Sequence, residues 1–170
     1  MLHFDKLILN NFGPYKGRQV IDFTLESGVT IFWGNNGRGK TTLLNAFRYA
    51  LFGVIQRRNG QLKHLSEMEN EEAKTDGHYG FCVTLKMTND DDKYELTREF
   101  VPRKGVVKPN GDEDYIKEYY LKKNGSILSP SDCEHELNVI MPQQISRFFL
   151  FDAESVSYTH LRAHETLMNL

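Results

Sequence analysis

The residues with the clearest chemical meaning form the pattern G-x-x-x-x-G-K-[ST], which the sequence meets with Gly34, Gly39, Lys40 and Thr41. Glycines are needed in such a loop because its backbone N–H groups must wrap phosphate oxygens, and β-carbons would collide or forbid the required φ. The Lys40 ammonium suits β- and γ-phosphate oxygens, and the Thr41 hydroxyl suits Mg²⁺. We therefore expect Mg²⁺-ATP to bind at Gly34, Asn35, Asn36, Gly37, Arg38, Gly39, Lys40, Thr41 and Thr42.

A second candidate metal ligand is Asp152, which follows the apolar residues 148–151. Four apolar residues before an acid are typical of a buried strand that delivers a carboxylate to the Mg²⁺ of a nucleotide. The alternative is an acid that only ends a strand. We expect Thr41 and Asp152 to contact the metal, and we assign no catalytic residue within this chain.

The elements around the loop give the motif its meaning. Residues 29–33 are β-branched and aromatic and are bounded by glycines, which predicts a fully buried central strand that enters the loop. From Lys40 to Phe52 apolar residues recur at helical spacing, and Gly53 stands where a C-terminal glycine cap belongs. Such a helix would point its unsatisfied N–H groups and its positive dipole end at the phosphates.

The rest of the chain predicts mainly antiparallel β structure, in which the first and second strands and the third and fourth strands form hairpins. A polar excursion at residues 56–76 contains a possible short helix at 62–73, and a further helix is expected at 131–141, with Ser131 as its N-cap and Glu134 completing a capping box. We therefore expect an α/β fold, a P-loop NTPase with an antiparallel β portion. The predicted strands lie at residues 4–12, 19–25, 79–88, 93–101, 116–122 and 148–151.

Bulk composition describes one ordinary globular domain. The chain has 170 residues, of which 39% are hydrophobic and 26% are charged. A net charge of -2 neither indicates nor excludes contact with DNA, because a local basic face is compatible with it. Cys82 and Cys133 lack metal-site spacing and are expected to be inert thiols of a reducing compartment. No segment has the pattern of a signal peptide or a membrane span, so we expect a cytoplasmic protein without membrane contact.

Several stretches resemble the amino-terminal head of SMC-like, ABC-type ATPases. They are K-L-I-L-N-N-F at residues 6–12, I-D-F at 21–23, I-F-W-G-N-N-G-R-G-K-T-T-L-L-N-A at 31–46 and A-L-F-G at 50–53. Within that class the sequence is most similar to the DndD ATPases of DNA sulfur modification. This finer resemblance rests on N-F-G-P-Y-K-G at 11–17 and on P-Q-Q-I-S-R-F-F-L-F-D-A-E at 142–154.

The resemblance implies an ATP-binding lobe whose catalytic complement lies elsewhere. Heads of this class are split by a long coiled coil, and two heads sandwich ATP, so the implied partners are a second head as a homodimer, the protein's own carboxy-terminal lobe, and DNA. The implied roles are DNA modification, repair or phage defence, with ATP hydrolysis only in the full-length protein. Asp152 would occupy the loop that couples Mg²⁺ and the γ-phosphate to the rest of the head.

The sequence departs from its relatives at three positions. Repair ATPases of this class carry arginine where this chain has Gly13 and a magnesium-sensing glutamine where it has Asp152. Ala153 stands where a DndD protein would have glycine. These departures bear on which member of the class the chain resembles, and less on the class itself.

The last residues have a different character. Residues 156–170 resemble the translation of a transposon-type sequencing adapter followed by an index. We therefore expect a native amino-terminal lobe at residues 1–154 and an adapter-derived tail at 155–170, so that the chain is a fragment. The alternative is a natural tail with a helical pattern.

Two other classes of function remain open for a P-loop chain of this length. One is a self-contained small NTPase or nucleotide kinase, although no Asn-Lys-x-Asp base-reading motif is present. The other is a nucleotide-binding switch that does not hydrolyse its ligand. Turnover by the chain alone would favour the first, and tight binding without turnover in any context would favour the second.

Overall fold

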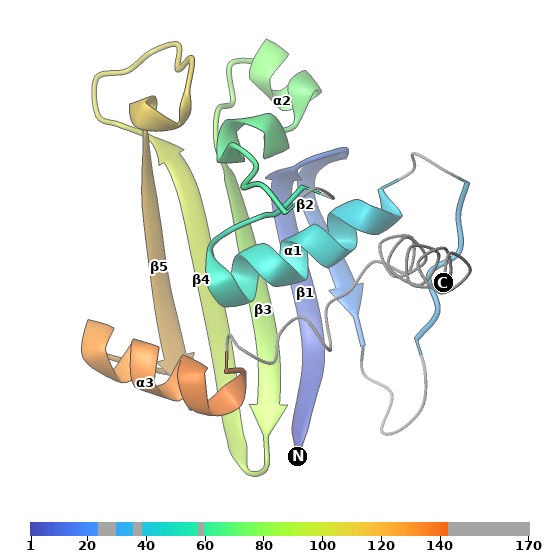
Figure 1. The fold of residues 1–170 in the computed structure, drawn as a ribbon, viewed down its shortest axis with the longest axis vertical. Helices are drawn as coiled ribbons and strands as arrows, with labels where there is room; N and C mark the ends of the chain where they lie inside the picture. Colours follow the sequence, from blue (N-terminus) through green and yellow to red (C-terminus); the bar gives the residue numbers. More distant parts are fainter. Residues whose placement is uncertain (24–29, 36–38, 58–59, 143–170) are drawn as a thin grey trace, which may run out of the picture.

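The computed structural model describes residues 1–23, 30–35, 39–57 and 60–142, and all structural statements below refer to these residues. They form one six-stranded antiparallel sheet in the order β2-β1-β3-β4-β5-β6, with helix α1 lying across one face (Figure 1). The elements are β1 Leu2–Phe12, β2 Tyr15–Asp22, α1 Lys40–Phe52, η1 Leu65–Met68, α2 Glu71–Thr75, β3 Phe81–Asn89, β4 Asp92–Pro102, η2 Asp112–Asp114, β5 Tyr115–Lys123, β6 Ser126–Ile127 and α3 Pro130–Ile140.

The core lies between the sheet and α1. Alternate side chains of β3 point toward the helix and are buried, as the two-residue period of a strand requires. A chain of aromatic contacts joins the sheet to the helix and links Phe12, Tyr49, Phe81, Phe100 and Tyr115, the last two stacked with ring centroids 4.1 Å apart. This packing fixes the position of α1, whose first turn follows the glycine-rich loop.

Most of the secondary structure predicted around the core is confirmed. Helix α1 has the predicted bounds, and Gly53 ends it in the left-handed conformation with its N–H donating to Tyr49 O. Both hairpins are present, although β2 begins at Tyr15, four residues earlier than residue 19, where the strand was expected. Strand β5 turns at Asn124 and Gly125 as expected.

The predicted central strand at residues 29–33 is wrong for the part that the structure describes. Residues 30–35 have no regular secondary structure, and Ile31 and Trp33 are 63% and 87% exposed. A buried strand needs hydrogen-bonded neighbours and covered faces. No described strand pairs with residues 30–33, so the β-forming composition of this run is not sufficient to make it a strand here.

Two helix predictions also need correction. Helix α3 is capped by Ser129, whose Oγ accepts from Asp132 N, and not by Ser131. The helix starts at Pro130, because a first-turn residue needs no N–H and the proline ring already has a helical φ. In the polar excursion, the helix expected at 62–73 is two short pieces, η1 and α2, with a break at Glu69 and Asn70.

Several expectations lie outside the described residues. They concern the strand at 148–151, Asp152, and the tail at 155–170.

Candidate nucleotide-binding site

The loop delivers Gly39 to the start of α1 in a conformation suited to anion binding. Gly39 is buried, has φ +96° and is the N-terminal cap residue, yet no described side chain caps the helix and no acid lies in its first turn. The first N–H groups of a helix have no intrahelical acceptor and carry the positive end of its dipole. This helix start is therefore open to a phosphate in both geometry and charge.

Lys40 turns back over the loop that precedes it. Its Nζ donates to Gly34 O and, at 2.9 Å, to Asn35 O. The structure thus brings together Gly34, Asn35 and Lys40, three of the predicted site residues, and the Lys40 side chain is exposed.

The hairpin turn between β1 and β2 packs directly against the end of the loop. A β-carbon at Gly39 would lie 2.8 Å from Tyr15 Oη and 3.1 Å from Pro14 Cγ. One at Gly13, whose φ is +56°, would lie 2.7 Å from Thr42 Cγ2. Side chains cannot approach so closely, so glycine at both positions is what allows the turn and the loop to touch.

Tyr15 adds a polar contact to this packing. Its hydroxyl donates to Gly39 O at 3.2 Å. Partial burial raises the pKa of the Tyr15 phenol, so the group stays protonated and remains a donor through the physiological range. In the sequence, the contacts of Gly13 and Tyr15 are signalled only by the pattern at residues 11–17. That pattern indicated a family resemblance and did not predict contacts with the loop.

Arg98 of β4 holds the other end of α1. Its Nε donates to Ala50 O at 2.6 Å and its Nη2 to Leu51 O at 3.2 Å, so it pairs carbonyls that the last helical turn leaves without intrahelical donors. The guanidinium also lies 4.4 Å from the centre of the Tyr119 ring. Burial lowers the Arg98 pKa, but guanidinium stays charged in proteins, so its cation complements the negative end of the helix dipole.

The residues present fit a magnesium nucleotide. The observation that tests the fit is the helix start behind Gly39, where no described side chain caps the helix, no acid lies in the first turn, and a β-carbon would lie 2.8 Å from Tyr15 Oη. The predicted residues Thr41 and Thr42 lie in the first turn of α1, and Thr41 is exposed. Mg²⁺ commonly takes few protein ligands and completes its shell with water and phosphate oxygens, so a single hydroxyl is a sufficient contribution from α1.

Three predicted loop residues and one predicted metal ligand belong to other parts of the chain than the structure describes. Asn36, Gly37, Arg38 and Asp152 all lie outside the described residues. Within the described ranges, no group of three or more His, Cys, Asp or Glu side chains is arranged to hold a metal.

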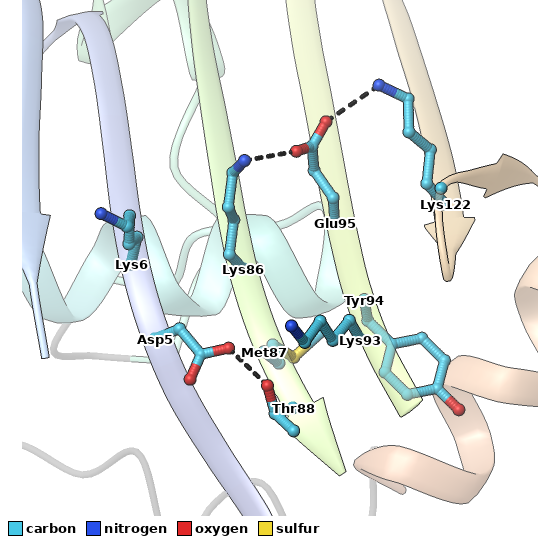
Figure 2. A pocket seen from close by; sticks show the side chains of 10 residues that line it. Asp5, Lys6, Lys86, Met87, Thr88, Lys93, Tyr94, Glu95 and Lys122 are labelled. Atoms are coloured by element: carbon cyan, nitrogen blue, oxygen red, sulfur yellow. Dashed lines mark hydrogen bonds and ion pairs between the residues drawn. The ribbon is translucent and has the colours of Figure 1, made fainter. Parts of the chain in front are cut away.

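A separate hollow of about 420 Å³ lies on the face of the sheet away from α1, and Figure 2 shows its polar lining. Glu95 pairs with Lys86 at 2.7 Å and with Lys122 at 2.9 Å, while Thr88 Oγ1 donates to Asp5 at 2.7 Å (Figure 2). Its lysines are thus largely matched by carboxylates, and the hollow is remote from the loop. We assign no nucleotide contact to it.

Comparison with known proteins identifies the class to which this geometry belongs. A family model described as an AAA domain matches residues 6–165. The chain belongs to this AAA-domain family. Its α/β fold, with an antiparallel sheet beside a P-loop helix, is that of the amino-terminal lobe of an SMC-like, ABC-type ATPase head. Nucleotide binding, typically with Mg²⁺, is a property of that family.

The curated relatives that the chain matches are named for a nuclease and for DNA double-strand break repair. The chain is 26% identical over 155 residues to the SbcC component of the nuclease SbcCD from Lactococcus lactis, an alignment that covers 84% of this chain and 14% of the relative. It is 30% identical over 101 residues to the DNA double-strand break repair Rad50 ATPase of Nanoarchaeum equitans, covering 59% of this chain and 11% of that protein. Identity rises to 44% over 48 residues for the SbcC component of the same nuclease from Treponema pallidum, covering 28% of this chain and 5% of the relative. The chain therefore spans only a small part of these relatives.

No helix in the described residues is long and apolar enough to cross a membrane.

Proposed function

We propose that this chain binds Mg²⁺-ATP as the amino-terminal lobe of an SMC-like ATPase head that acts on DNA. The observation that carries the proposal is the start of α1, where Gly39 leads into a helix that no described side chain caps and whose first turn holds no acid, and where Lys40 turns over the loop. Backbone N–H groups and the ammonium would hold the phosphates, while Thr41 and Asp152 would contact the metal.

Hydrolysis in this proposal needs a second lobe and a second head. No residue of the chain is assigned the hydrolytic base, and heads of this class sandwich ATP between two copies. Support for a completing lobe comes from the apolar side chains of Ile31 and Trp33 beside the loop, which are 63% and 87% exposed among the described residues. The chain alone would bind ATP with little turnover, and the tail at 155–170 would contribute nothing.

DNA repair is the pathway that the named relatives favour, because they include a nuclease component and a double-strand break repair ATPase. DNA sulfur modification of the DndD type is the alternative, and it rests on the sequence patterns at residues 11–17 and 142–154. The two differ in a measurable way. Deletion of the gene would sensitise cells to DNA breaks in the first case and would alter the sulfur content of DNA in the second.

Calorimetric titration of Mg²⁺-ATP into the 170-residue chain tests the binding step. Lys40→Ala should weaken binding by a factor on the order of one hundred, because it removes a charge-assisted contact to the phosphates. Lys122→Ala is the matched control, since Lys122 lies on the opposite face of the sheet and pairs with Glu95. Equal affinities of the unaltered and Lys40→Ala chains would refute the role given to Lys40.

A further inference from the structure

The short segment at residues 68–70 binds both backbone polar groups of Gly13, at the turn between β1 and β2. Gly13 N donates to Met68 O at 2.6 Å, and Asn70 Nδ2 donates to Gly13 O at 2.8 Å. Asn70 N also donates to Asn11 O at 3.0 Å. The turn is therefore held in place by hydrogen bonds from a segment more than fifty residues away in the chain.

The same turn packs against Gly39 at the end of the phosphate loop and against the first turn of α1. Gly13 lies against Thr42, and Tyr15 donates to Gly39 O. We propose that Asn70 and Tyr15 are positioning residues for phosphate binding. Asn70 holds the β1–β2 turn in place through its hydrogen bond to Gly13 O, and Tyr15, which follows that turn, holds Gly39 through its hydrogen bond to Gly39 O. This inference rests on the proposed function, because it concerns the same ATP site.

Asn70 is suited to this role because both the oxygen and the nitrogen of its side-chain amide make hydrogen bonds. Its Oδ1 accepts from Ala73 N at 2.9 Å and so caps α2, while its Nδ2 donates to Gly13 O. The residue is only 5% exposed, so water cannot easily replace a lost partner. Aspartate would keep the cap but would set a carboxylate against the Gly13 carbonyl, whereas no hydroxyl side chain would span both contacts.

The segment that carries Asn70 is itself fixed to the core of the sheet. The neighbouring Glu69 carboxylate is 4% exposed and accepts from Gly80 N at 2.5 Å and from Tyr115 Oη at 2.7 Å. Asp112 accepts from Leu65 N and Ser66 N at 3.0 and 2.9 Å. A rigid anchor of this kind is what a positioning contact needs, because a mobile support would not define where the turn lies.

The test uses two conservative variants of the 170-residue chain, Asn70→Asp and Tyr15→Phe, and their double variant. Tyr15→Phe keeps the ring that packs on Gly39 and removes only the donor. Mg²⁺-ATP affinity is measured by calorimetry at a temperature where thermal melts find every variant folded. Asn124→Asp is the matched control, because Asn124 also accepts from a backbone N–H, of Lys93, and donates its Nδ2, to Asp92.

We expect each single variant to weaken Mg²⁺-ATP binding about five- to tenfold, and Asn124→Asp to leave it unchanged whatever it does to the melting temperature. Because both residues act through one turn, the double variant should weaken binding less than the product of the single effects. If Asn70 and Tyr15 had a merely structural role, the variants would lower the melting temperature but would not weaken Mg²⁺-ATP binding.

Two results would overturn the inference, and they are distinguishable. If the unaltered chain binds Mg²⁺-ATP and both single variants bind within twofold of it, the positioning role is wrong and the proposed function stands. If the unaltered chain does not bind Mg²⁺-ATP at all, the proposed function fails and the inference fails with it.

Discussion

Arg98 links a strand in the middle of the sheet to the helix that carries the phosphate loop. It donates to two carbonyls at the end of α1, and these would be left without partners if its side chain were shortened. Such a residue is not predictable from local sequence, because its partners Ala50 and Leu51 lie 48 and 47 positions away. The same holds for Asn70, which looks like an ordinary surface residue until its contacts are known.

Replacing Arg98 should therefore destabilise the fold more than its half-buried position suggests. Arg98→Met is expected to lower the free energy of unfolding by about 2–3 kcal/mol, because charge-assisted hydrogen bonds are lost and buried acceptors stay unpaired. Arg103→Met is the control, since the exposed Arg103 also donates to a carbonyl, of Glu113. It should cost less than about 1 kcal/mol. Urea denaturation measures both, and equal losses would contradict the role given to Arg98.

At the scale of elements, local sequence patterns correctly predicted the helix and the hairpins, whose formation depends mainly on interactions between residues close in sequence. Helix α1 and its glycine cap follow from apolar spacing, and both hairpins follow from alternation and turn residues. The run at residues 29–33 has strand composition, yet residues 30–33 are not a strand, because strand formation depends on partners. The cap of α3 was misplaced because Ser129 and Ser131 both fit, and only the proline between them favours the first.

The hairpin of β1 and β2 offers a paired test of the contact between its turn and the loop. Gly13 and Gly17 both have positive φ, +56° and +64°, so alanine is strained at either position. Only at Gly13 would the new β-carbon meet α1, at Thr42 Cγ2. Both variants should lose about 1 kcal/mol of stability from backbone strain.

Only Gly13→Ala should in addition weaken Mg²⁺-ATP binding, by a factor on the order of ten, because its methyl group displaces the first turn of α1. Melting curves and calorimetric titrations on the same samples separate strain from displacement. Equal nucleotide affinities for the two variants would argue against coupling between the turn and the loop.

As far as the structure describes it, the whole molecule is a six-stranded sheet with α1 across one face and α3 contributing Cys133 and Ile140 to the core. The described contacts that fix the loop come from distant parts of the chain: the β1–β2 turn, segment 68–70 behind that turn, and Arg98 at the far end of α1. From the sequence alone the loop could be located and a nucleotide proposed as its ligand, since the motif resides in contiguous residues. The surrounding support could not, since it depends on how the sheet folds back on itself.

The central claim is that this loop binds nucleotide through its β- and γ-phosphates. Calorimetric titration of the unaltered chain with Mg²⁺-ATP, Mg²⁺-ADP and AMP tests it directly. We predict that Mg²⁺-ATP and Mg²⁺-ADP bind and that AMP binds at least about tenfold more weakly, because it lacks the oxygens that the helix start and Lys40 would hold. AMP binding as tight as Mg²⁺-ATP binding, or no binding of Mg²⁺-ATP, would contradict the account.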